Sequence, residues 1–489
     1  MSVLEGVNID DIQAIVASGQ KDLAYGKYIL LKFNDRIKAK SYLSQLLPMI
    51  SKVSDGVGPD YFYNIAFTHV GIDFIENDGE LRKSFQLEFI DGMNEPNRNK
   101  ILGDEGYNGP EKWCFGKNRN SIHALLIIYG KEYNIDDIYR KQIELFKQYD
   151  IEIEEDIEAN LHADYKEHFG FVDGISNPKI EGIHSKTPLK ERQQLYLKPG
   201  EFILGYKNEY NDYSPFPSLG FNEKVKAKLS DIGISHSDGA FVKEDKYWFG
   251  KNGSYLVFRQ LEQDVSAFWE YQLEHVDNEA EAIKNAAKMM GRWPNGSPIT
   301  KEQYRNNNGG ENATKENDFL YFENDKAGLG CPIGAHIRRA NPRDHLITEN
   351  SKKASKQVTR KKQMIRRGRS YGKPVVDSMN TNEIIDSVRA KSVKGKRGLN
   401  FVALVSTISR QFEFVQSSWM QSPAFAGLRD ENDPIIGTKE IEGKNERNNF
   451  TCPMHPFSTQ QKELPSFVKM KGGQYFFLPG ITAIKYLSK

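Results

Sequence analysis

Ser121-Ile122-His123-Ala124-Leu125-Leu126-Ile127-Ile128-Tyr129 is the stretch that decides the fold, because apolar residues fill it almost without a break. A short run of this kind predicts a strand that is buried on both faces. Outward from it, strands are predicted at residues 28–33, 61–68, 85–90 and 151–158, and helices at residues 37–50 and 135–149. With one of the middle strands set aside as an addition, this order is the split βαβ arrangement of a ferredoxin-like domain.

The second half of the chain is predicted to repeat this order with larger insertions. Strands are expected at residues 253–261, 397–406 and 472–479. Apolar residues at positions 408, 412, 415 and 419 have the spacing of one buried helical stripe. We therefore expect an α+β protein with two ferredoxin-like halves, residues 1–185 and 186–489.

Two stretches of the second half are too polar to belong to a core. Residues 304–326 are rich in Asn, Gly and charge, and residues 351–369 contain nine Lys or Arg and no acidic residue. Both are predicted to be exposed insertions, because a dense basic run is usually a solvated loop. For the basic stretch, binding of nucleic acid or of another anionic partner is the alternative.

The composition is that of a globular protein without a general preference for a charged partner. Of 489 residues, 38% are hydrophobic, and the formal net charge is +1, which disfavours nucleic acid and membrane surfaces as general partners. The N-terminus has no signal-peptide pattern, and no stretch has the roughly 18 apolar residues of a membrane span. Three cysteines exclude a disulfide framework, and none lies in a Cys-x-x-Cys-His haem attachment. We therefore expect a cytoplasmic location.

Three motifs hold residues that suit chemistry. Gly330-Cys-Pro-Ile-Gly-Ala-His-Ile-Arg-Arg-Ala-Asn-Pro-Arg343 places His336 between glycine-rich backbone and a run of arginines. This constellation suits haem, because a neutral imidazole can bind the iron and the cations can meet its propionates. Asp173 lies between glycines, and Arg366 precedes a Gly-Arg-Ser-Tyr-Gly sequence. In isolation, each motif also fits a turn, a core histidine or a surface charge.

In this order, and along nearly the whole chain, these motifs resemble the dye-decolourising peroxidases, a family of haem-b enzymes with two ferredoxin-like halves in a dimeric α+β barrel-like fold. Gly170-Phe171-Val172-Asp173-Gly174 resembles the family's Gly-x-x-Asp-Gly signature. Further similar stretches are residues 64–68, 102–113, 291–293, 410–416 and 472–479. The segment between His336 and Arg366 departs from the family in length and charge, which leaves the route of substrate entry open.

The resemblance implies a haem-dependent peroxidase that reduces hydrogen peroxide and oxidises dyes, phenolic donors or other organic donors through a ferryl intermediate. His336 would bind the iron of a non-covalent haem b, and Asp173 and Arg366 would be the distal catalytic pair. Glu413 is the expected acceptor of a hydrogen bond from His336. The expected cofactor contacts are Gly170, Phe171, Val172, Gly174, Ile175, Arg338, Leu404, Phe414 and Glu413, with Arg338 and Arg343 as candidates for the propionates.

Alternative functions use some of the same residues. A non-enzymatic haem-binding or haem-storage protein would use His336 without peroxide chemistry. Thr451-Cys-Pro-Met-His-Pro456 resembles a short copper-binding segment of heavy-metal exporters, and its thiolate, thioether and imidazole would suit Cu(I). Cys331, His336, Cys452 and His455 could instead form a zinc site. The sequence does not identify the physiological donor, the tyrosines or tryptophans that carry electrons, encapsulation in a shell, or the oligomeric state, with a homo-oligomer among the options.

Overall fold

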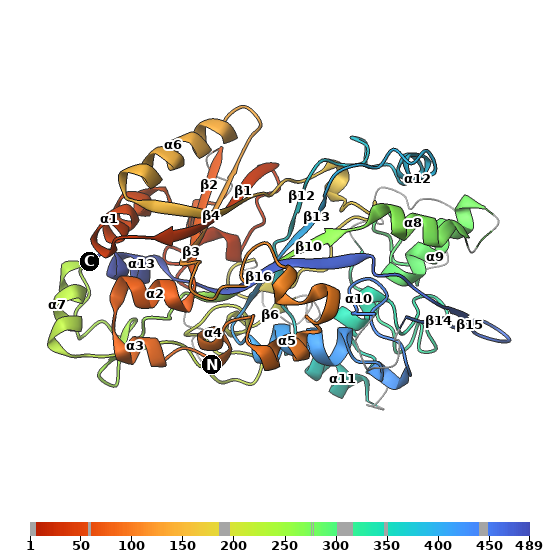
Figure 1. Cartoon of the computed structure of the whole chain (residues 1–489). Helices are drawn as coiled ribbons and strands as arrows, with labels where there is room; N and C mark the ends of the chain where they lie inside the picture. The colour runs from red at the N-terminus through yellow and green to blue at the C-terminus, as the bar shows by residue number, and fades with distance from the viewer. Residues whose placement is uncertain are drawn as a thin grey trace.

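A nine-stranded sheet runs through the middle of the protein (Figure 1). The computed structural model describes residues 6–56, 60–184, 196–274, 276, 278–300, 316–346, 351–439 and 448–489. The strands of the sheet are β1 (Tyr25–Phe33), β2 (Tyr61–Phe67), β3 (Ala124–Gly130), β4 (Ile151–Glu158), β10 (Ser254–Gln263), β11 (Ile365–Arg366), β12 (Arg369–Tyr371), β13 (Gly398–Val405) and β16 (Val468–Leu478). They lie in the order β11-β13-β10-β16-β2-β3-β1-β4, and β12 also pairs with β13.

The first four strands form the ferredoxin-like half that the sequence predicts. They pair antiparallel in the order β2-β3-β1-β4, with α1 (Arg36–Leu46) after β1 and α6 (Ile135–Gln148) after β3. Side chains alternate across β1, so that Ile29 and Leu31 join the core that includes α1 and α6, whereas Tyr28 and Leu30 join the core of the opposite face. Both faces of the sheet are therefore buried.

The strand predicted at residues 85–90 is wrong, because helix α4 (Leu87–Asp91) occupies this stretch. Phe89 is buried on α4, and its ring packs 4.9 Å from that of Phe85, which precedes the helix. Without this strand, the main elements of the first half are β1, α1, β2, β3, α6 and β4. No middle strand then has to be set aside to obtain the split βαβ order.

The second half repeats the order, because β16 and β13 flank β10, and β11 and β12 pair with β13. Helix α8 (Val265–Glu274) follows β10, and a π-helical run, Ser409–Glu413 and Val415–Met420, follows β13. The two halves join where Phe477 of β16 pairs with Phe67 of β2. The α+β class with two ferredoxin-like halves is therefore confirmed, while the boundary predicted at residue 185 lies outside the described residues.

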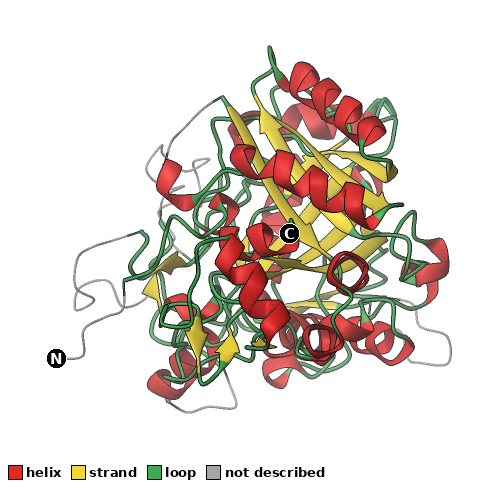
Figure 2. Ribbon diagram, turned by 90° about the vertical axis from the view of Figure 1, so that its left-hand side faces the viewer, coloured by secondary structure: helices red, strands yellow, loops and turns green. Residues whose placement is uncertain are grey.

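The remaining elements surround the sheet (Figure 2). The helices are α2 (His69–Glu76), α3 (Gly79–Lys83), α5 (Pro96–Leu102), α7 (Glu223–Asp231), α9 (Glu279–Met290), α10 (His336–Ala340), α11 (Lys352–Arg360), α12 (Thr381–Arg389) and α13 (Ile481–Leu487). The short strands are β5 (Lys179–Ile180), β6 (Tyr196–Leu197), β7 (Leu219–Gly220), β8 (Val242–Lys243), β9 (Lys246–Tyr247), β14 (Phe450–Cys452) and β15 (Thr459–Gln461). In the part of the chain that the structure describes, no helix combines the length and the apolar character that crossing a membrane requires.

The two polar stretches of the second half are more ordered than their composition predicts. About half of the basic stretch forms α11, in which Ser355 and Thr359 are buried, and β11 follows shortly after it. In the other stretch, residues 304–315 lie outside the described residues, but Phe319 and Tyr321 are buried. An amphipathic helix thus stands where the charge pattern predicted a solvated loop.

Candidate active site

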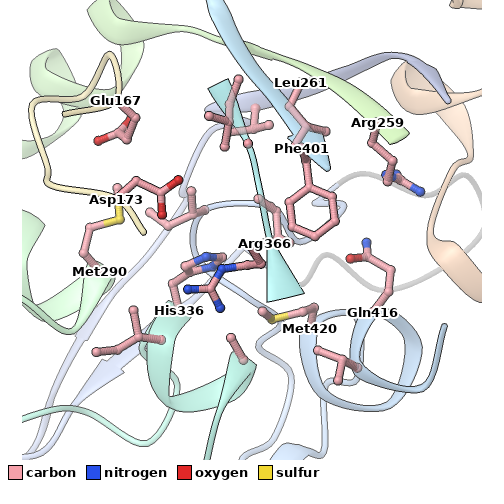
Figure 3. A pocket seen from close by; sticks show the side chains of 18 of the residues that line it. Glu167, Asp173, Arg259, Leu261, Met290, His336, Arg366, Phe401, Gln416 and Met420 are labelled. Carbon is pink, nitrogen blue, oxygen red and sulfur yellow. The ribbon is translucent and has the colours of Figure 1, made fainter. Parts of the chain in front are cut away.

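A cavity lined by residues of both halves collects the residues of the three motifs (Figure 3). His336 enters it from the first position of α10, Arg366 from β11, and Asp173 from the segment between β4 and β5. The remaining walls are largely apolar and include Phe171, Val172, Leu261, Met290, Ile337, Met364, Leu399, Phe401, Phe412, Val415, Met420, Ile435, Ile436, Val468 and Met470. Three residues that are far apart in the sequence therefore share one water-poor site.

His336 is oriented by Asp433, a residue that the sequence did not single out. The imidazole Nδ1 lies 3.1 Å and 3.0 Å from the two carboxylate oxygens of Asp433, which is fully buried. Burial lowers the pKa of His336, but the charge and hydrogen bond of Asp433 outweigh it and leave that pKa raised. Burial likewise raises the pKa of Asp433, but His336 brings it below its usual range. With Nδ1 engaged, Nε2 is the ring nitrogen that can bind a metal in the cavity.

The prediction that Glu413 accepts the hydrogen bond from His336 is wrong. Glu413 instead accepts hydrogen bonds from Arg98 and from the hydroxyl of Tyr475. In the run that follows β13, Phe412, Val415 and Gln416 line the cavity, so Glu413 points to a different side of the helix. Glu413 is therefore also not one of the residues that line the cavity, so it is not placed to contact a cofactor there.

Asp173 and Arg366 face the cavity that contains His336 (Figure 3). Asp173 is held by its own loop, because its Oδ1 accepts a hydrogen bond of 2.6 Å from Gly174 N. Asn177 connects this loop to β11, since its Oδ1 accepts from Arg366 N at 2.8 Å and its Nδ2 donates to Arg366 O at 3.0 Å. The Asn177 side chain thus fixes the carboxylate loop and the arginine strand to each other.

The predicted glycine-rich contact segment reaches the cavity only with its central residues. Phe171, Val172 and Asp173 line it, whereas Gly170, Gly174 and Ile175 lie outside the lining. Gly170 has a φ of +93°, and a Cβ atom there would lie 3.1 Å from Ile384 Cδ1. This glycine serves the turn that presents the neighbouring residues rather than contacting the cavity itself.

Leu404 and Phe414 are also placed outside the cavity lining, for reasons of side-chain direction. Leu399 and Phe401 of β13 line the cavity, so the even-numbered Leu404 faces the opposite core of the sheet. Phe414 packs against Trp419, with ring centroids 5.5 Å apart. Both residues were assigned from sequence position alone, which does not report the face on which a side chain emerges.

The prediction for Arg338 is wrong, whereas Arg343 does line the cavity. On α10, Ile337 and Ala340 face the cavity, and Arg338 is buried on the other side, where it donates to Cys331 O at 2.6 Å and pairs with Asp325 at 3.3 Å. The rotation of α10 therefore turns Arg338 away from the cavity, and Arg343, which follows this helix, is the arginine that could meet a propionate.

Arg343 and Arg292 form a cationic end of the cavity. Their guanidinium carbons lie 3.9 Å and 5.2 Å from the ring centroid of Phe319. Both donate to neutral carbonyl oxygens, Arg343 to Asn317 O and Arg292 to Gly296 O. Burial and the proximity of Arg343 lower the pKa of Arg292 to about 10. An imidazole, apolar walls and cations held by neutral acceptors fit haem, whose flat ring is apolar and whose propionates are anionic.

Glu167 is a further cavity residue that the sequence did not reveal (Figure 3). Its carboxylate accepts hydrogen bonds of 2.9 Å from Phe169 N and from Phe171 N, so it closes the turn that leads to Asp173. Burial raises the pKa of Glu167 to about 7, and Asp173 adds to this rise. The local sequence, Glu167-His168-Phe169-Gly170-Phe171, matches no motif that would have indicated a residue of the cavity.

The raised pKa makes Glu167 a source of pH-dependent stability. Between pH 4.5 and 7, the native state keeps a proton on Glu167 that the unfolded state has lost, so the free energy of unfolding falls as pH rises. The loss is up to about 3 kcal/mol. Glu167→Gln is expected to flatten this part of the curve in urea unfolding at several pH values, whereas Glu158→Gln, at an exposed position, should follow the wild type. Curves of equal slope for Glu167→Gln and the wild type would contradict the assignment.

The zinc and copper alternatives receive no support from the arrangement. Among the described residues, which include Cys331, His336, Cys452 and His455, no group of three or more metal-binding His, Cys, Asp or Glu side chains occurs. Cys452 is buried, whereas Met454, two residues later, is about half exposed. Neither alternative is favoured over haem.

Curated relatives match the chain along nearly its whole length. No family model matches the chain. "Peroxidase 2" from Mycetinis scorodonius is 27% identical over 98% of this chain and 87% of its own length. "Dye-decolorizing peroxidase AauDyP1" from Auricularia auricula-judae is 27% identical over 98% of this chain and 86% of its own length. "Multifunctional dye peroxidase DyP2" from an Amycolatopsis strain is 30% identical over 67% of this chain and 62% of its own length.

Solved structures agree with these relatives at the level of the fold. The structure of a dye-decolorizing peroxidase with an engineered haem pocket has a TM-score of 0.75 and 24% identity, and the match covers 99% of this chain and all of that one. A peroxidase of this type from Anabaena has a TM-score of 0.72 and 21% identity over 99% of this chain and 98% of its own. The curated peroxidases match this chain over nearly its full length, and the solved structures share its fold, so the chain is similar to the dye-decolourising peroxidases in both sequence and architecture.

Proposed function

We propose that the protein is a peroxidase that uses a non-covalent haem b to reduce hydrogen peroxide and to oxidise dyes, phenols or other organic donors. The observation that carries this proposal is the meeting of His336, Asp173 and Arg366 in one apolar cavity. The names of the relatives, which are peroxidases and dye peroxidases, support it. Haem storage alone would need His336 but neither Asp173 nor Arg366.

In this proposal, His336 holds the haem iron through Nε2, because Nδ1 is engaged by Asp433. Arg343 and Arg292 lie at the end of the cavity where the haem carboxylates would be neutralised. When bound, haem supplies an iron that takes up peroxide and the electrons that peroxide reduction requires.

The residues on the distal side would manage protons and charge. Asp173 accepts the proton from one peroxide oxygen and returns it to the departing oxygen. Arg366, which stays protonated, stabilises the negative charge that develops on the departing oxygen. The apolar walls keep water away and so strengthen both interactions.

An absorption spectrum of the purified protein, loaded with haem, tests the proposal. We expect the spectrum of a histidine-ligated ferric haem, a change on adding one equivalent of hydrogen peroxide, and a return to the starting spectrum when an anthraquinone dye or a phenol is added. Haem-free protein should bleach no dye. A haem spectrum that peroxide leaves unchanged would favour the storage function.

Asp433→Asn tests the proximal arrangement. An amide cannot supply the negative charge that raises the basicity of His336, so we expect haem affinity to fall by about 10- to 100-fold and the reduction potential of the bound iron to rise. Haem dissociation kinetics and a spectroelectrochemical titration measure the two effects. Asp430→Asn removes the same charge at an exposed position three residues away and should change neither quantity. Unchanged affinity and potential in Asp433→Asn would argue against His336 as the ligand.

A cytoplasmic location, a homo-oligomeric state and the absence of nucleic acid as a partner stay predictions from the sequence. The free cysteines, of which Cys331 and Cys452 are buried, support a reducing compartment. Size-exclusion chromatography with light scattering, and fractionation of cells that contain the protein, would test the first two.

A further inference from the structure

A buried tyrosine lies next to the wall of the cavity and is bonded to a carboxylate. Tyr475 of β16 is 1% exposed, and its hydroxyl donates a hydrogen bond of 2.8 Å to Glu413 Oε1. Glu413 is 6% exposed and also accepts from Arg98, whose other terminal nitrogen lies 3.3 Å from Asp91. Tyrosine, glutamate, arginine and aspartate thus form a chain of hydrogen bonds that starts in the core.

Tyr475, the first member of this series of hydrogen bonds, is separated from the cavity by the ring of Phe412. The rings of Tyr475 and Phe412 lie 6.2 Å apart at an angle of 77°. Phe412 lines the cavity, as does Phe401, whose ring lies 6.2 Å from that of Phe412. Figure 3 shows Phe401 at the wall of the cavity. The phenol ring of Tyr475 is therefore close to the wall of the cavity, although Tyr475 is not one of the residues that line it.

A carboxylate that accepts a hydrogen bond from a buried phenol makes one-electron oxidation of that phenol easier. If a phenol loses one electron and keeps its proton, a positive charge remains in the core, and burying a charge is costly. Glu413 lies within the distance over which a proton can transfer directly, so the proton can leave as the electron leaves. Burial raises the pKa of Glu413 although Arg98 lowers it, which makes the carboxylate a better proton acceptor. The charge of Arg98, which loses its ionised partner in this step, is still faced by Asp91.

We propose that Tyr475 is a redox-active residue that gives one electron to the haem once peroxide has oxidised it, and that passes its proton to Glu413. The inference rests on the proposed peroxidase function, which supplies hydrogen peroxide as the oxidant. Reduction of one hydrogen peroxide to two waters takes two electrons and two protons. The haem would supply both electrons, Tyr475 would replace one of them, and over the full cycle the organic donor supplies two electrons and two protons. In this step the O–H bond of the phenol breaks, a phenoxyl radical remains, and an O–H bond forms on Glu413. An organic donor later returns one electron, and the proton moves back to the phenoxyl oxygen.

Three other tyrosines among the described residues share part of these features. Tyr133 and Tyr139 also donate to carboxylates, those of Asp60 and Asp156, but both pairs are exposed to solvent. Tyr255 on β10 is as buried as Tyr475 and lies close by, since Tyr475 pairs with Val257 of the same strand. The hydroxyl of Tyr255 accepts from Gln86 N instead of donating to a carboxylate. Tyr255 is therefore a matched control.

Electron paramagnetic resonance of haem-loaded protein, frozen within a second of adding one equivalent of hydrogen peroxide, tests the inference. We expect a tyrosyl radical in the wild type, at least tenfold less of it in Tyr475→Phe, and an unchanged amount in Tyr255→Phe. Glu413→Gln should lower the yield or shift the g-values, because the proton acceptor has changed. An undiminished signal of the same shape in Tyr475→Phe would overturn the assignment, and identical spectra of Glu413→Gln and the wild type would overturn the role of Glu413.

A measurement on the wild type keeps the inference open to disproof even if a variant does not fold. Electron–nuclear double resonance should find one strongly coupled proton, hydrogen-bonded to the radical oxygen, that exchanges in heavy water. Its absence would overturn the inference. Peroxide consumption in the same samples separates the two proposals. Peroxide consumed without a radical at Tyr475 overturns this inference alone, whereas no consumption by haem-loaded wild type overturns the peroxidase function and this inference with it.

Discussion

His336→Ala is expected to lose haem, with a dissociation constant at least about 100-fold higher than that of the wild type. The imidazole is the side chain in the cavity that combines a nitrogen suited to iron with a partner, Asp433, that fixes its orientation. Haem occupancy, measured from the ratio of haem to protein absorption after purification and after transfer to an apo-globin acceptor, checks this expectation.

Two controls separate loss of the ligand from loss of the fold. Removing His336 leaves Asp433 buried without its partner, which costs about 3–5 kcal/mol of stability. The double variant His336→Ala with Asp433→Asn removes this unpaired charge and should still fail to bind haem. Added imidazole, which fits the space left by the side chain, should restore part of the binding, and His236→Ala, at an exposed histidine, should bind as the wild type does. Full haem occupancy with an unchanged spectrum in His336→Ala would show that another residue binds the iron.

Arg366→Ala is expected to lower kcat/KM for hydrogen peroxide by about 10²- to 10³-fold while haem stays bound. The guanidinium faces the cavity with Asp173, and its charge is what a departing oxygen would meet. Stopped-flow absorption, which follows the reaction of the haem protein with peroxide, measures the rate directly, and the resting spectrum reports that haem is present.

The size of the loss should follow the charge at this position. Arg366→Lys keeps a cation but not the planar fork of donors, so an intermediate rate is expected. Lys353→Ala removes a cation from the exposed side of α11 and should leave the rate unchanged. A rate in Arg366→Ala equal to that of the wild type would remove Arg366 from the mechanism and would leave Asp173 to be tested by Asp173→Asn.

Local pattern was sufficient for most of the sheet. Strand β4 begins and ends where the alternation of residues 151–158 predicts, and the apolar run of residues 121–129 overlaps β3. The error at residues 85–90 arises because so short an apolar run fits a strand as well as a helix, and the packing of Phe89 on α4 against Phe85 and the core decides between them. Short apolar runs carry this ambiguity in general.

The site could be predicted where a motif names a residue, but not where a partner comes from another part of the chain. His336, Asp173 and Arg366 stand out in their motifs. Asp433 lies 97 residues after His336, in a loop without a recognisable pattern. The sequence therefore favours Glu413, on the apolar helix, as the hydrogen-bond acceptor of His336. The face on which a side chain emerges depends on the rotation of its helix or strand. The rotation of α10 turns Arg338 away from the cavity, whereas Arg343, beyond the end of α10, lines it.

The side-chain amide of Asn177 joins the two halves of the chain beside the cavity. Its paired hydrogen bonds with the backbone of Arg366 tie the carboxylate loop of one half to a strand of the other. One side chain therefore fixes the segment that carries Asp173 to the strand that carries Arg366, whatever the length of the surrounding loops. Those loops can change in length and charge, and such changes would alter which donors reach the cavity. The relative position of Asp173 and Arg366 would stay the same.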